Sequence, residues 1–462
     1  MGSMMFGPIF LSLALIQADP IDTYVEAQMA AQHIPGLCLL VVKDGKPIKE
    51  KAYGLSNVET TKPAQLSDRF DIGSIGKTFT ATMIMQLVNE RKLSLDQKVA
   101  QILPDFPEKW ESITIRHLIS HQSGIPDYAF MPGIGLNDTY NQNAWTDQVY
   151  KAKLDFPTGR LFQYSNSNFV LLGMVLEQLT GKKFKDLAKE RLFEPAGMSD
   201  TVFKEISKGL PSRSATGYFF IDGKLEDGGP GGNSPTNADG GEFSTVYDLQ
   251  RWREAVNNGK VLPTSSVKRM QTPSPILSGR KTGYGLGWMT ATLEGSPQIT
   301  HGGNSVGFSG TITTFPKQRL EIYMLCNLYP VGGDGFAVGI AKLLEPTLNR
   351  KPQVSTIDPN PDLTNKLTVG LVELSKANIK TQLFHEDMQL RLATQRGQMA
   401  LPAFANFANV TKMEYISKRV EKPDTVYRYR VFDGKASWIV DFQVTKEGQI
   451  YSIAKSPDTD RK

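Results

Sequence analysis

The chain has 462 residues, 40% of them hydrophobic and 21% charged, which is typical of a globular protein with a sizeable core. The net charge is only +5 and no basic tract occurs, which argues against nucleic acid as a partner. The five histidines are scattered, without an H-E-x-x-H pattern or a Cys/His cluster, so the sequence indicates no catalytic metal and no other cofactor.

The chain begins with an apolar run, Met5 to Ile16, followed by a small-residue cleavage point after Ala18. This pattern predicts a secretory signal peptide over residues 1–18 and therefore a periplasmic or secreted protein. No Lys or Arg precedes the run, so an apolar helix packed on the domain or anchored at a membrane interface is the alternative. The run is too short to span a bilayer comfortably and no other segment would span one, so we expect no stable membrane span.

A helix over about residues 21–32 leads to two predicted strands, 37–43 and 48–55, joined by a turn at Asp44-Gly45. The strands are nearly continuously apolar, which indicates a sheet that is covered on both faces. The two cysteines, Cys38 and Cys326, both fall in strand-like runs, and buried free thiols are favoured over a disulfide.

Ser74-Ile75-Gly76-Lys77 opens an amphipathic run that reaches about Glu90. Side chains three apart on one helix share a face, so the Lys77 amine is expected beside the Ser74 hydroxyl. A serine hydroxyl becomes a good nucleophile when a neighbouring base takes its proton. The first turn of a helix also has unpaired N–H groups that can face a developing oxyanion. The plain alternative is a solvated pair on a helix surface.

A mostly helical region follows, from Ser74 to about Leu192. Within it, residues 130–145 form a predicted loop with aromatic side chains that line a pocket or simply pack. His117 and His121 lie one helical turn apart, which is compatible with a ligand pair but favours packed or capping residues.

Tyr164-Ser165-Asn166 lies in a loop that leads into an apolar helix over residues 169–179. A tyrosine near an ammonium group can serve as a general base, and the Asn166 amide can bind a substrate carbonyl or hold Lys77. The alternative is a buried tyrosine beside an Asn–Ser helix cap. Residues 222–241 are rich in Gly, Asp and Asn without periodicity, and we expect a long loop near the mouth of the site.

His301-Gly302-Gly303-Asn304 follows a short strand-like run. Two glycines there allow another backbone to approach closely, and a substrate along that edge would meet the Asn304 N–H as an oxyanion donor. The alternative is a hairpin turn with a solvent-facing histidine. The G-x-S-x-G pattern at 303–307 is followed by a strand-like run instead of the helix that a nucleophile elbow requires, which argues against that reading.

The S-x-x-K, Y-x-N and H-G-G motifs, in that order, resemble those of the penicillin-recognising serine hydrolases. This family includes class C β-lactamases, D-aminopeptidases, D,D-carboxypeptidases and family VIII esterases. The flanking stretches FDIG (70–73), IRHLISHQSGIP (115–126), PAGM (195–198), GGEFST (240–245) and YGLGW (284–288) extend the resemblance over about residues 22 to 348.

The resemblance implies an α/β (α+β type) β-lactamase/transpeptidase-like fold, with an antiparallel sheet flanked by helices, a helical subdomain and the site between them. It implies that Ser74 is the acylated nucleophile and that Lys77 and Tyr164 share the base role. Asn166 would position substrate and Lys77, and the Ser74 and Asn304 N–H groups would form the oxyanion hole. The third motif, His301-Gly302-Gly303, would border the substrate.

The third motif departs from the family pattern, because β-lactamases and carboxypeptidases of the family have a lysine where this chain has His301. A histidine is mostly neutral at pH 7, so an anchor for a substrate carboxylate is weakened. This favours internal peptide bonds, aminopeptidase substrates, amides or esters over β-lactams and strict carboxypeptidase substrates.

We expect a first domain over residues 19–350 that ends with strands from about 298 to 328 and a helix near 335–344. Prolines at 352, 359 and 361 mark a linker to a small α+β domain of unknown role, residues 351–462. Helices are predicted there over 363–377 and 386–394, and strands over 412–420, 425–432, 437–444 and 449–454.

The sequence therefore predicts a serine hydrolase with a Ser74 acyl-enzyme that acts on short peptides or amides, with D-residue-containing peptides among the candidate substrates. The alternatives are a carboxylesterase or weak β-lactamase, and a non-catalytic ligand-binding or sensor protein on the same scaffold. The expected partner is a small peptide, amide or ester substrate, and the sequence does not indicate an oligomeric state.

Overall fold

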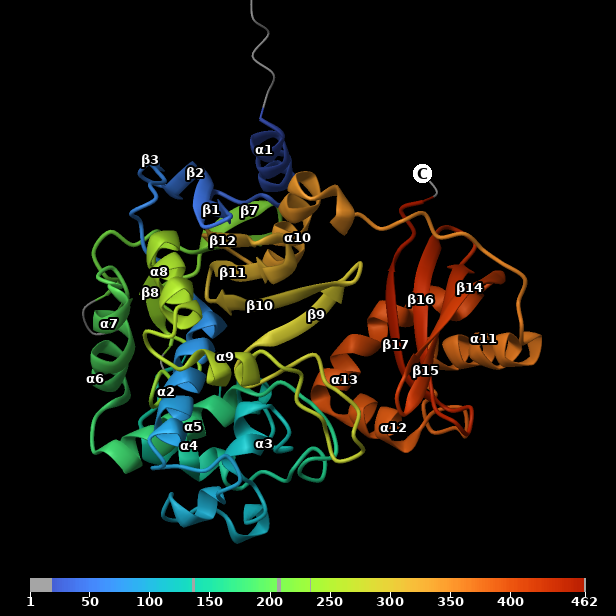
Figure 1. Ribbon diagram of the computed structural model, residues 1–462, viewed down its shortest axis with the longest axis horizontal. Helices are drawn as coiled ribbons and strands as arrows, with labels where there is room; N and C mark the ends of the chain where they lie inside the picture. The colour runs from blue at the N-terminus through green and yellow to red at the C-terminus, as the bar shows by residue number, and fades with distance from the viewer. Residues whose placement is uncertain (1–18, 135–137, 206–208, 233, 461–462) are drawn as a thin grey trace, which may run out of the picture.

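The computed structural model describes residues 19–134, 138–205, 209–232 and 234–460. The predicted signal peptide, residues 1–18, lies outside the described residues. Figure 1 shows a larger body, built on an antiparallel sheet with helices around it, and a small sheet domain beside it that is formed by the C-terminal part of the chain. Within the described part of the chain, no helix has the length and apolar character needed to cross a membrane.

The central sheet has seven strands, each antiparallel to its neighbours. In spatial order they are β3 (Lys62–Pro63), β2 (Lys46–Asn57), β1 (Gly36–Lys43), β12 (Leu320–Cys326), β11 (Phe308–Phe315), β10 (Ser296–Ser305) and β9 (Met289–Leu293). The first and last long strands of the larger body, β1 and β12, are thus neighbours at the centre of the sheet.

Both faces of this sheet are covered, as the apolar strand runs predict. Along β1, Leu37, Leu39 and Val41 pack in a core with helices α1 (Pro20–Gln32) and α10 (Gly333–Leu344). The alternate side chains of β1 join the other core, which contains α2 (Lys77–Asn89) and α8 (Val246–Asn257). Successive strand residues point to opposite faces, so one short apolar run supplies both cores.

The same alternation separates the two cysteines. Cys38 and Cys326 are both buried and free. They lie on adjacent strands, but Cys38 points into the core with α2 and Cys326 into the core with α1. Side chains on opposite faces of a sheet cannot be bridged without moving the backbone, so the free thiols favoured from the sequence are confirmed.

The helical part contains α3 (Ile115–Ile119), α4 (Gln142–Val149), α5 (Asn166–Thr180), α6 (Phe184–Ala188), the π-helical η5 (Lys189–Phe193), α7 (Glu194–Ala196) and α9 (Thr264–Met270). Short 3-10 turns are η1 (Gly73–Gly76), η2 (Val99–Gln101), η3 (Glu108–Trp110), η4 (Tyr128–Phe130), η7 (Pro316–Gln318) and η8 (Pro346–Leu348). Two small sheets join distant segments: β4 (Phe70–Asp71) with β8 (Glu242–Ser244) and β5 (Val202–Phe203), and β13 (Leu328–Tyr329) with β6 (Tyr218–Ile221) and β7 (Lys224–Asp227).

Two predicted loops prove more regular than expected. The segment 222–241 begins with a hairpin, because β6 and β7 pair around the Asp222-Gly223 turn, where both residues have positive φ. The segment 130–145 ends inside α4, where Trp145 is fully buried. Short polar strands and helices carry weak periodicity, so neither element was recognised from the sequence.

The C-terminal domain packs helices on one four-stranded antiparallel sheet with its own apolar core. Its elements are α11 (Pro361–Ser375), α12 (Glu386–Ala393), α13 (Gln395–Ala400), η9 (Leu401–Asn409), β14 (Lys412–Glu421), β15 (Asp424–Phe432), β16 (Ser437–Val444) and β17 (Ile450–Pro457). Gly434 and Gly448 have positive φ in the predicted hairpin turns. Helix α13 and turn η9 were not predicted.

Candidate active site

Ser74 lies in the 3-10 turn η1, and α2 begins only at Lys77. The expectation that Ser74 opens the α-helix itself is therefore wrong by one turn. The turn is tight because Gly73 has φ +48° and packs against strand β10, where a Cβ on Gly73 would lie 2.5 Å from the Asn304 carbonyl oxygen. The contact brings the backbone of Asn304 beside the Ser74 turn, as the third motif predicts.

Lys77 is fully buried, and its Nζ contacts three oxygens. Ser74 Oγ lies 3.0 Å away, Asn166 Oδ1 2.8 Å and the Asp239 carbonyl oxygen 2.5 Å. The last two oxygens only accept hydrogen bonds, whereas a hydroxyl both donates and accepts. A neutral amine would give its two hydrogens to Asn166 and Asp239 and turn its lone pair to the Ser74 hydroxyl.

The orientation of the Asn166 amide is fixed by Asp127. Asn166 Nδ2 donates to both carboxylate oxygens of Asp127, at 3.1 and 3.2 Å. A carboxylate accepts only, so the amide nitrogen faces Asp127 and Oδ1 faces Lys77. Asn166 is the first residue of α5, so the buried helix behind it holds the side chain in place.

Tyr164 lies directly before α5, in the loop that the sequence predicts. Lys77 Nζ is 5.2 Å from the centroid of its ring. Among the described residues the buried Tyr164 hydroxyl has no hydrogen-bond partner. Its ring packs against the buried imidazole of His121, with centroids 4.3 Å apart, and this contact holds the ring in place.

Strand β10 runs through the whole third motif, and residues 301–305 pair with β11 but not with β9. A Cβ on Gly303 would lie 1.8 Å from the Ile72 carbonyl oxygen, whereas one on Gly302 would have 3.5 Å to Asp334. Gly303 is thus required for the close approach of the Ser74 turn. Beyond Thr300, none of the described strands pairs with the edge of β10 that faces away from β11. Such an edge suits an extended substrate.

His301 is fully buried, so the alternative of a hairpin turn with a solvent-facing histidine is wrong. Its Nδ1–H donates to the Gly302 carbonyl oxygen at 2.8 Å, which leaves Nε2 to accept from the Tyr284 hydroxyl at 3.1 Å. Burial lowers the pKa of His301 to about 3. The imidazole is therefore neutral at pH 7, and contact of this side chain with substrate stays a prediction.

Two buried carboxyl groups near Lys77 were not assigned a role from the sequence. Burial raises the pKa of Asp239, whose side chain accepts a hydrogen bond from the Tyr128 hydroxyl at 2.8 Å. Burial raises the pKa of Glu242 well above its usual range, and its oxygens lie behind the Ser74 turn, 2.2 Å from where a Gly76 Cβ would be. In the sequence, Glu242 lies within the GGEFST stretch and Asp239 directly precedes it.

The candidate site opens into a small cavity of 80 Å³. Ser74, Asn166, Asn304 and Lys204 line it together with glycines of the 228–241 segment. Part of the segment 222–241 therefore borders the site, as its composition predicts. Lys204 is a buried lysine in this wall, 3.6 Å from Asp71, and no sequence motif indicates its position there.

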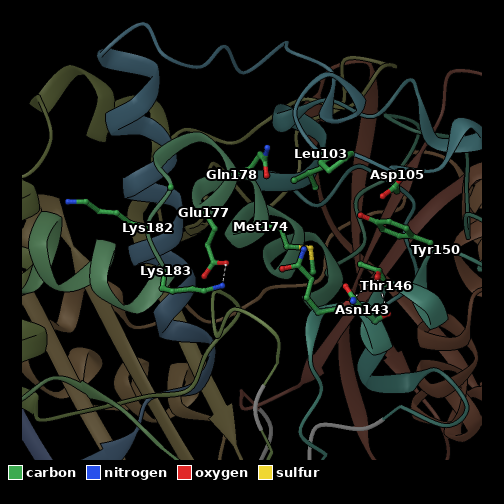
Figure 2. A pocket seen from close by; sticks show the side chains of 13 residues that line it. Leu103, Asp105, Asn143, Thr146, Tyr150, Met174, Glu177, Gln178, Lys182 and Lys183 are labelled. Atoms are coloured by element: carbon green, nitrogen blue, oxygen red, sulfur yellow. Dashed lines mark hydrogen bonds and ion pairs between the residues drawn. The ribbon is translucent and has the colours of Figure 1, made fainter.

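A larger pocket of 530 Å³ lies elsewhere, in the helical part (Figure 2). It is lined by Met174 and Glu177, eight and eleven residues beyond Asn166 on α5, and thus about 12–17 Å farther along the helix axis. Glu177 is paired there with Lys183 at 3.2 Å. None of the lining residues belongs to the predicted catalytic set, so we place the active site at Ser74.

His117 lies in α3, whereas His121 follows the end of this helix. His117 caps the helix, with its Nδ1 3.2 Å from the Thr114 nitrogen, and His121 Nδ1 accepts from the Ser165 N–H at 3.2 Å. Across the described ranges, no group of three or more His, Cys, Asp or Glu side chains is placed to hold a metal ion.

Comparison with known proteins identifies the larger body. The profile of the Beta-lactamase family matches residues 21–344. Protein flp of Staphylococcus aureus (strain MW2) is 29% identical over 67% of this chain and 62% of its own length. The D-aminopeptidase of Cereibacter sphaeroides is 27% identical over 68% of this chain and 60% of its own length. The chain thus matches less than two thirds of the length of these curated relatives.

Two solved structures extend the comparison. A D-stereospecific amidohydrolase from Streptomyces sp. has a TM-score of 0.60 at 27% identity, covering 69% of this chain and 96% of its own. The octameric penicillin-binding protein homologue from Pyrococcus abyssi has a TM-score of 0.63 at 21% identity, covering 94% of this chain and 95% of its own. The second match includes the C-terminal domain, and at this identity it bears on the fold alone.

Proposed function

Because the chain belongs to the Beta-lactamase family of serine hydrolases, we propose that it hydrolyses short peptides or amides through an acyl-enzyme on Ser74. One observation carries the proposal: Ser74 Oγ lies 3.0 Å from Lys77 Nζ, while Asn166 and Asp239 occupy the other two hydrogen-bonding positions of that nitrogen. The arrangement leaves a single direction for the lysine lone pair, toward the nucleophile.

In this mechanism the Ser74 oxygen attacks the substrate carbonyl carbon and its proton passes to Lys77 Nζ. The N–H groups of Ser74 and Asn304 stabilise the oxyanion. Tyr164, whose hydroxyl has no protein partner within the described ranges, carries the proton to the leaving nitrogen. Water then attacks the acyl carbon by the reverse proton path and releases Ser74.

The neutral His301 supports the choice of substrate. A lysine at this place would present a permanent cation, whereas the buried imidazole carries no charge at pH 7 to hold a substrate carboxylate. Substrates whose leaving part is uncharged are therefore favoured. The similarity to a D-aminopeptidase and to a D-stereospecific amidohydrolase supports amide bonds next to D-residues.

The test is a hydrolysis panel of D- and L-alanine p-nitroanilides, an N-acyl-D-Ala-D-Ala peptide, a p-nitrophenyl ester and a chromogenic cephalosporin. We expect the D-anilide to be turned over with the highest kcat/KM among the nitrogen-linked substrates, and the Ser74→Ala variant to turn over none. Hydrolysis of the ester alone would favour a carboxylesterase. No turnover of any compound by folded wild-type protein would favour the non-catalytic ligand-binding alternative.

A further inference from the structure

The C-terminal domain contacts the hydrolase body through arginine–carboxylate pairs. Arg160 of the body contacts Glu386 at 2.5 Å and Asp387 at 2.7 Å. Arg280 of the body binds both oxygens of Asp424, at 2.7 and 2.9 Å. Both pairs attach the small domain at places where no proposed catalytic residue takes part.

In a third pair the C-terminal domain supplies the arginine, and the carboxylate belongs to the site. Arg396, on α13, donates through its Nη2 to the Asp127 carboxylate. The guanidinium lies over two rings of the hydrolase body, 4.8 Å from the centroid of Phe130 and 5.5 Å from that of Tyr164. The small domain thus contacts the ring of Tyr164 directly.

Asp127 needs this partner because its side chain is only 2% exposed. Its remaining contacts are neutral donors, the Asn166 amide and the Ala129 N–H. A buried carboxylate without a cationic partner is costly.

A continuous series of polar contacts therefore joins the C-terminal domain to the nucleophile. It runs from Arg396 to Asp127, from Asp127 to the Asn166 amide nitrogen, from Asn166 Oδ1 to Lys77 Nζ, and from there to Ser74 Oγ. The direction of the Asn166 amide is set at the Asp127 end, and it decides whether Lys77 meets an oxygen or an NH2 group.

We propose that Arg396 is a positioning residue of the hydrolase site, supplied by the C-terminal domain, and that it holds Asp127 and Asn166 in the orientation that aligns Lys77 with Ser74. The inference rests on the proposed acylation of Ser74. It gives the C-terminal domain a function: the catalytic set is complete only when α13 is docked on the body.

The test compares full-length Arg396→Ala and Arg280→Ala. Each variant removes one arginine from the contact between domain and body, but only Arg396 touches the site. Asp424 keeps a hydrogen bond from Gln443 at 2.8 Å when Arg280 is lost, which makes that variant a suitable control. For each we measure kcat and KM on the best panel substrate and the rate at which a fluorophosphonate labels Ser74.

We expect Arg396→Ala to lower kcat about 100-fold with little change in KM, as for a misplaced catalytic group. We expect Arg280→Ala to stay within about twofold of wild type, as for a single ion pair outside the site. Guanidinium ion at millimolar concentration should restore part of the activity of Arg396→Ala and none to Arg280→Ala. Arg396→Lys, which keeps the charge and the overall size, should retain more activity than Arg396→Ala and serves if the alanine variant does not fold.

If Arg396→Ala and Arg280→Ala lower kcat by the same factor, Arg396 has no positioning role. A kcat of Arg396→Ala within twofold of wild type would overturn that role as well. An Arg396→Lys variant that folds and whose kcat is no higher than that of Arg396→Ala would overturn the charge-based part of the positioning role. Failure of wild-type protein to be labelled at Ser74 is a separate outcome, since it would overturn the proposed function itself.

Discussion

The atoms around Lys77 favour its proposed role in proton transfer. A lysine side chain is rarely buried without partners, and here three oxygens converge on its Nζ from η1, α5 and the segment before β8. Lys77 Nζ also lies over the face of the Tyr164 ring. The two residues are therefore expected to serve one proton path.

Lys77→Ala and Tyr164→Phe should each lower kcat by about three orders of magnitude, because residues that act as a unit in catalysis give large and non-additive losses. The double variant should be hardly slower than the poorer single variant. Steady-state kinetics of the four proteins on one substrate measure this coupling. A double variant whose loss equals the product of the two single losses would show that the residues act independently.

His301 should make folding stability sensitive to acid. Its pKa is about 3 in the folded protein, below the ordinary value of 6.5, so between these values the unfolded chain binds a proton that the folded chain does not. Stability contributed by the neutral imidazole is thus complete above pH 6.5 and is lost as the pH falls toward 3. The loss between pH 7 and pH 4 amounts to about 3 kcal/mol.

The measurement is the free energy of unfolding in urea from pH 7 to pH 4, for wild type and for His301→Gln. The variant removes the titrating group and keeps a hydrogen-bonding side chain, so its stability should fall less steeply with pH. The comparison is needed because Asp239 and Glu242, with raised pKa values, act in the opposite direction. Parallel curves for the two proteins would contradict the assigned pKa of His301.

At the scale of elements, the two glycines of β10 differ in what they do. Gly303 lets η1 approach the strand, whereas Gly302 has room for a methyl group and does not have a positive φ. Gly303→Ala should therefore lower the free energy of unfolding by about 2 kcal/mol or more, since backbone must move to accept the methyl group. Gly302→Ala, one position away, should cost less than about 1 kcal/mol. Thermal or urea unfolding of both variants tests the close approach; equal stabilities would contradict it.

The elements that carry strong periodicity were predictable. The apolar runs of β1 and β12, the helices α2 and α5, and the hairpins of the C-terminal domain with their Gly434 and Gly448 turns lie within a few residues of where the sequence places them. The start of α2 was not, because the 3-10 turn at Ser74 is imposed by the packing of Gly73 on β10, a contact more than two hundred residues away in the sequence. Short helices such as α13 lack enough turns for a period to appear.

The residues of the site also separate into those that the sequence predicts and those that it does not. Ser74, Lys77, Tyr164, Asn166 and Asn304 were found because motif spacing reports them, and the fold brings them to one place; their catalytic roles stay proposals. Asp127 and Lys204 approach the site through tertiary packing alone. The burial of His301 could not be predicted either, since it depends on Tyr284 and on the sheet position of β10.

At the scale of the whole molecule, Figure 1 shows the C-terminal domain beside the larger body, with α13 on the side that faces this body. Arg396 of α13 pairs there with Asp127 of the larger body. From the sequence this domain had no assigned role, because nothing in its own pattern indicates what it contacts. Its boundary at residue 351 and its independence in folding stay predictions.

The central claim is that Ser74 becomes acylated, and trapping the adduct tests it most directly. Full-length protein is mixed with the best panel substrate, quenched in acid within milliseconds to seconds, and analysed by intact mass and peptide mapping. We predict a mass increase equal to the acyl group, located on Ser74, that appears and decays with turnover and is absent from Ser74→Ala. Turnover without an adduct on Ser74, or an adduct on another residue, would contradict the account.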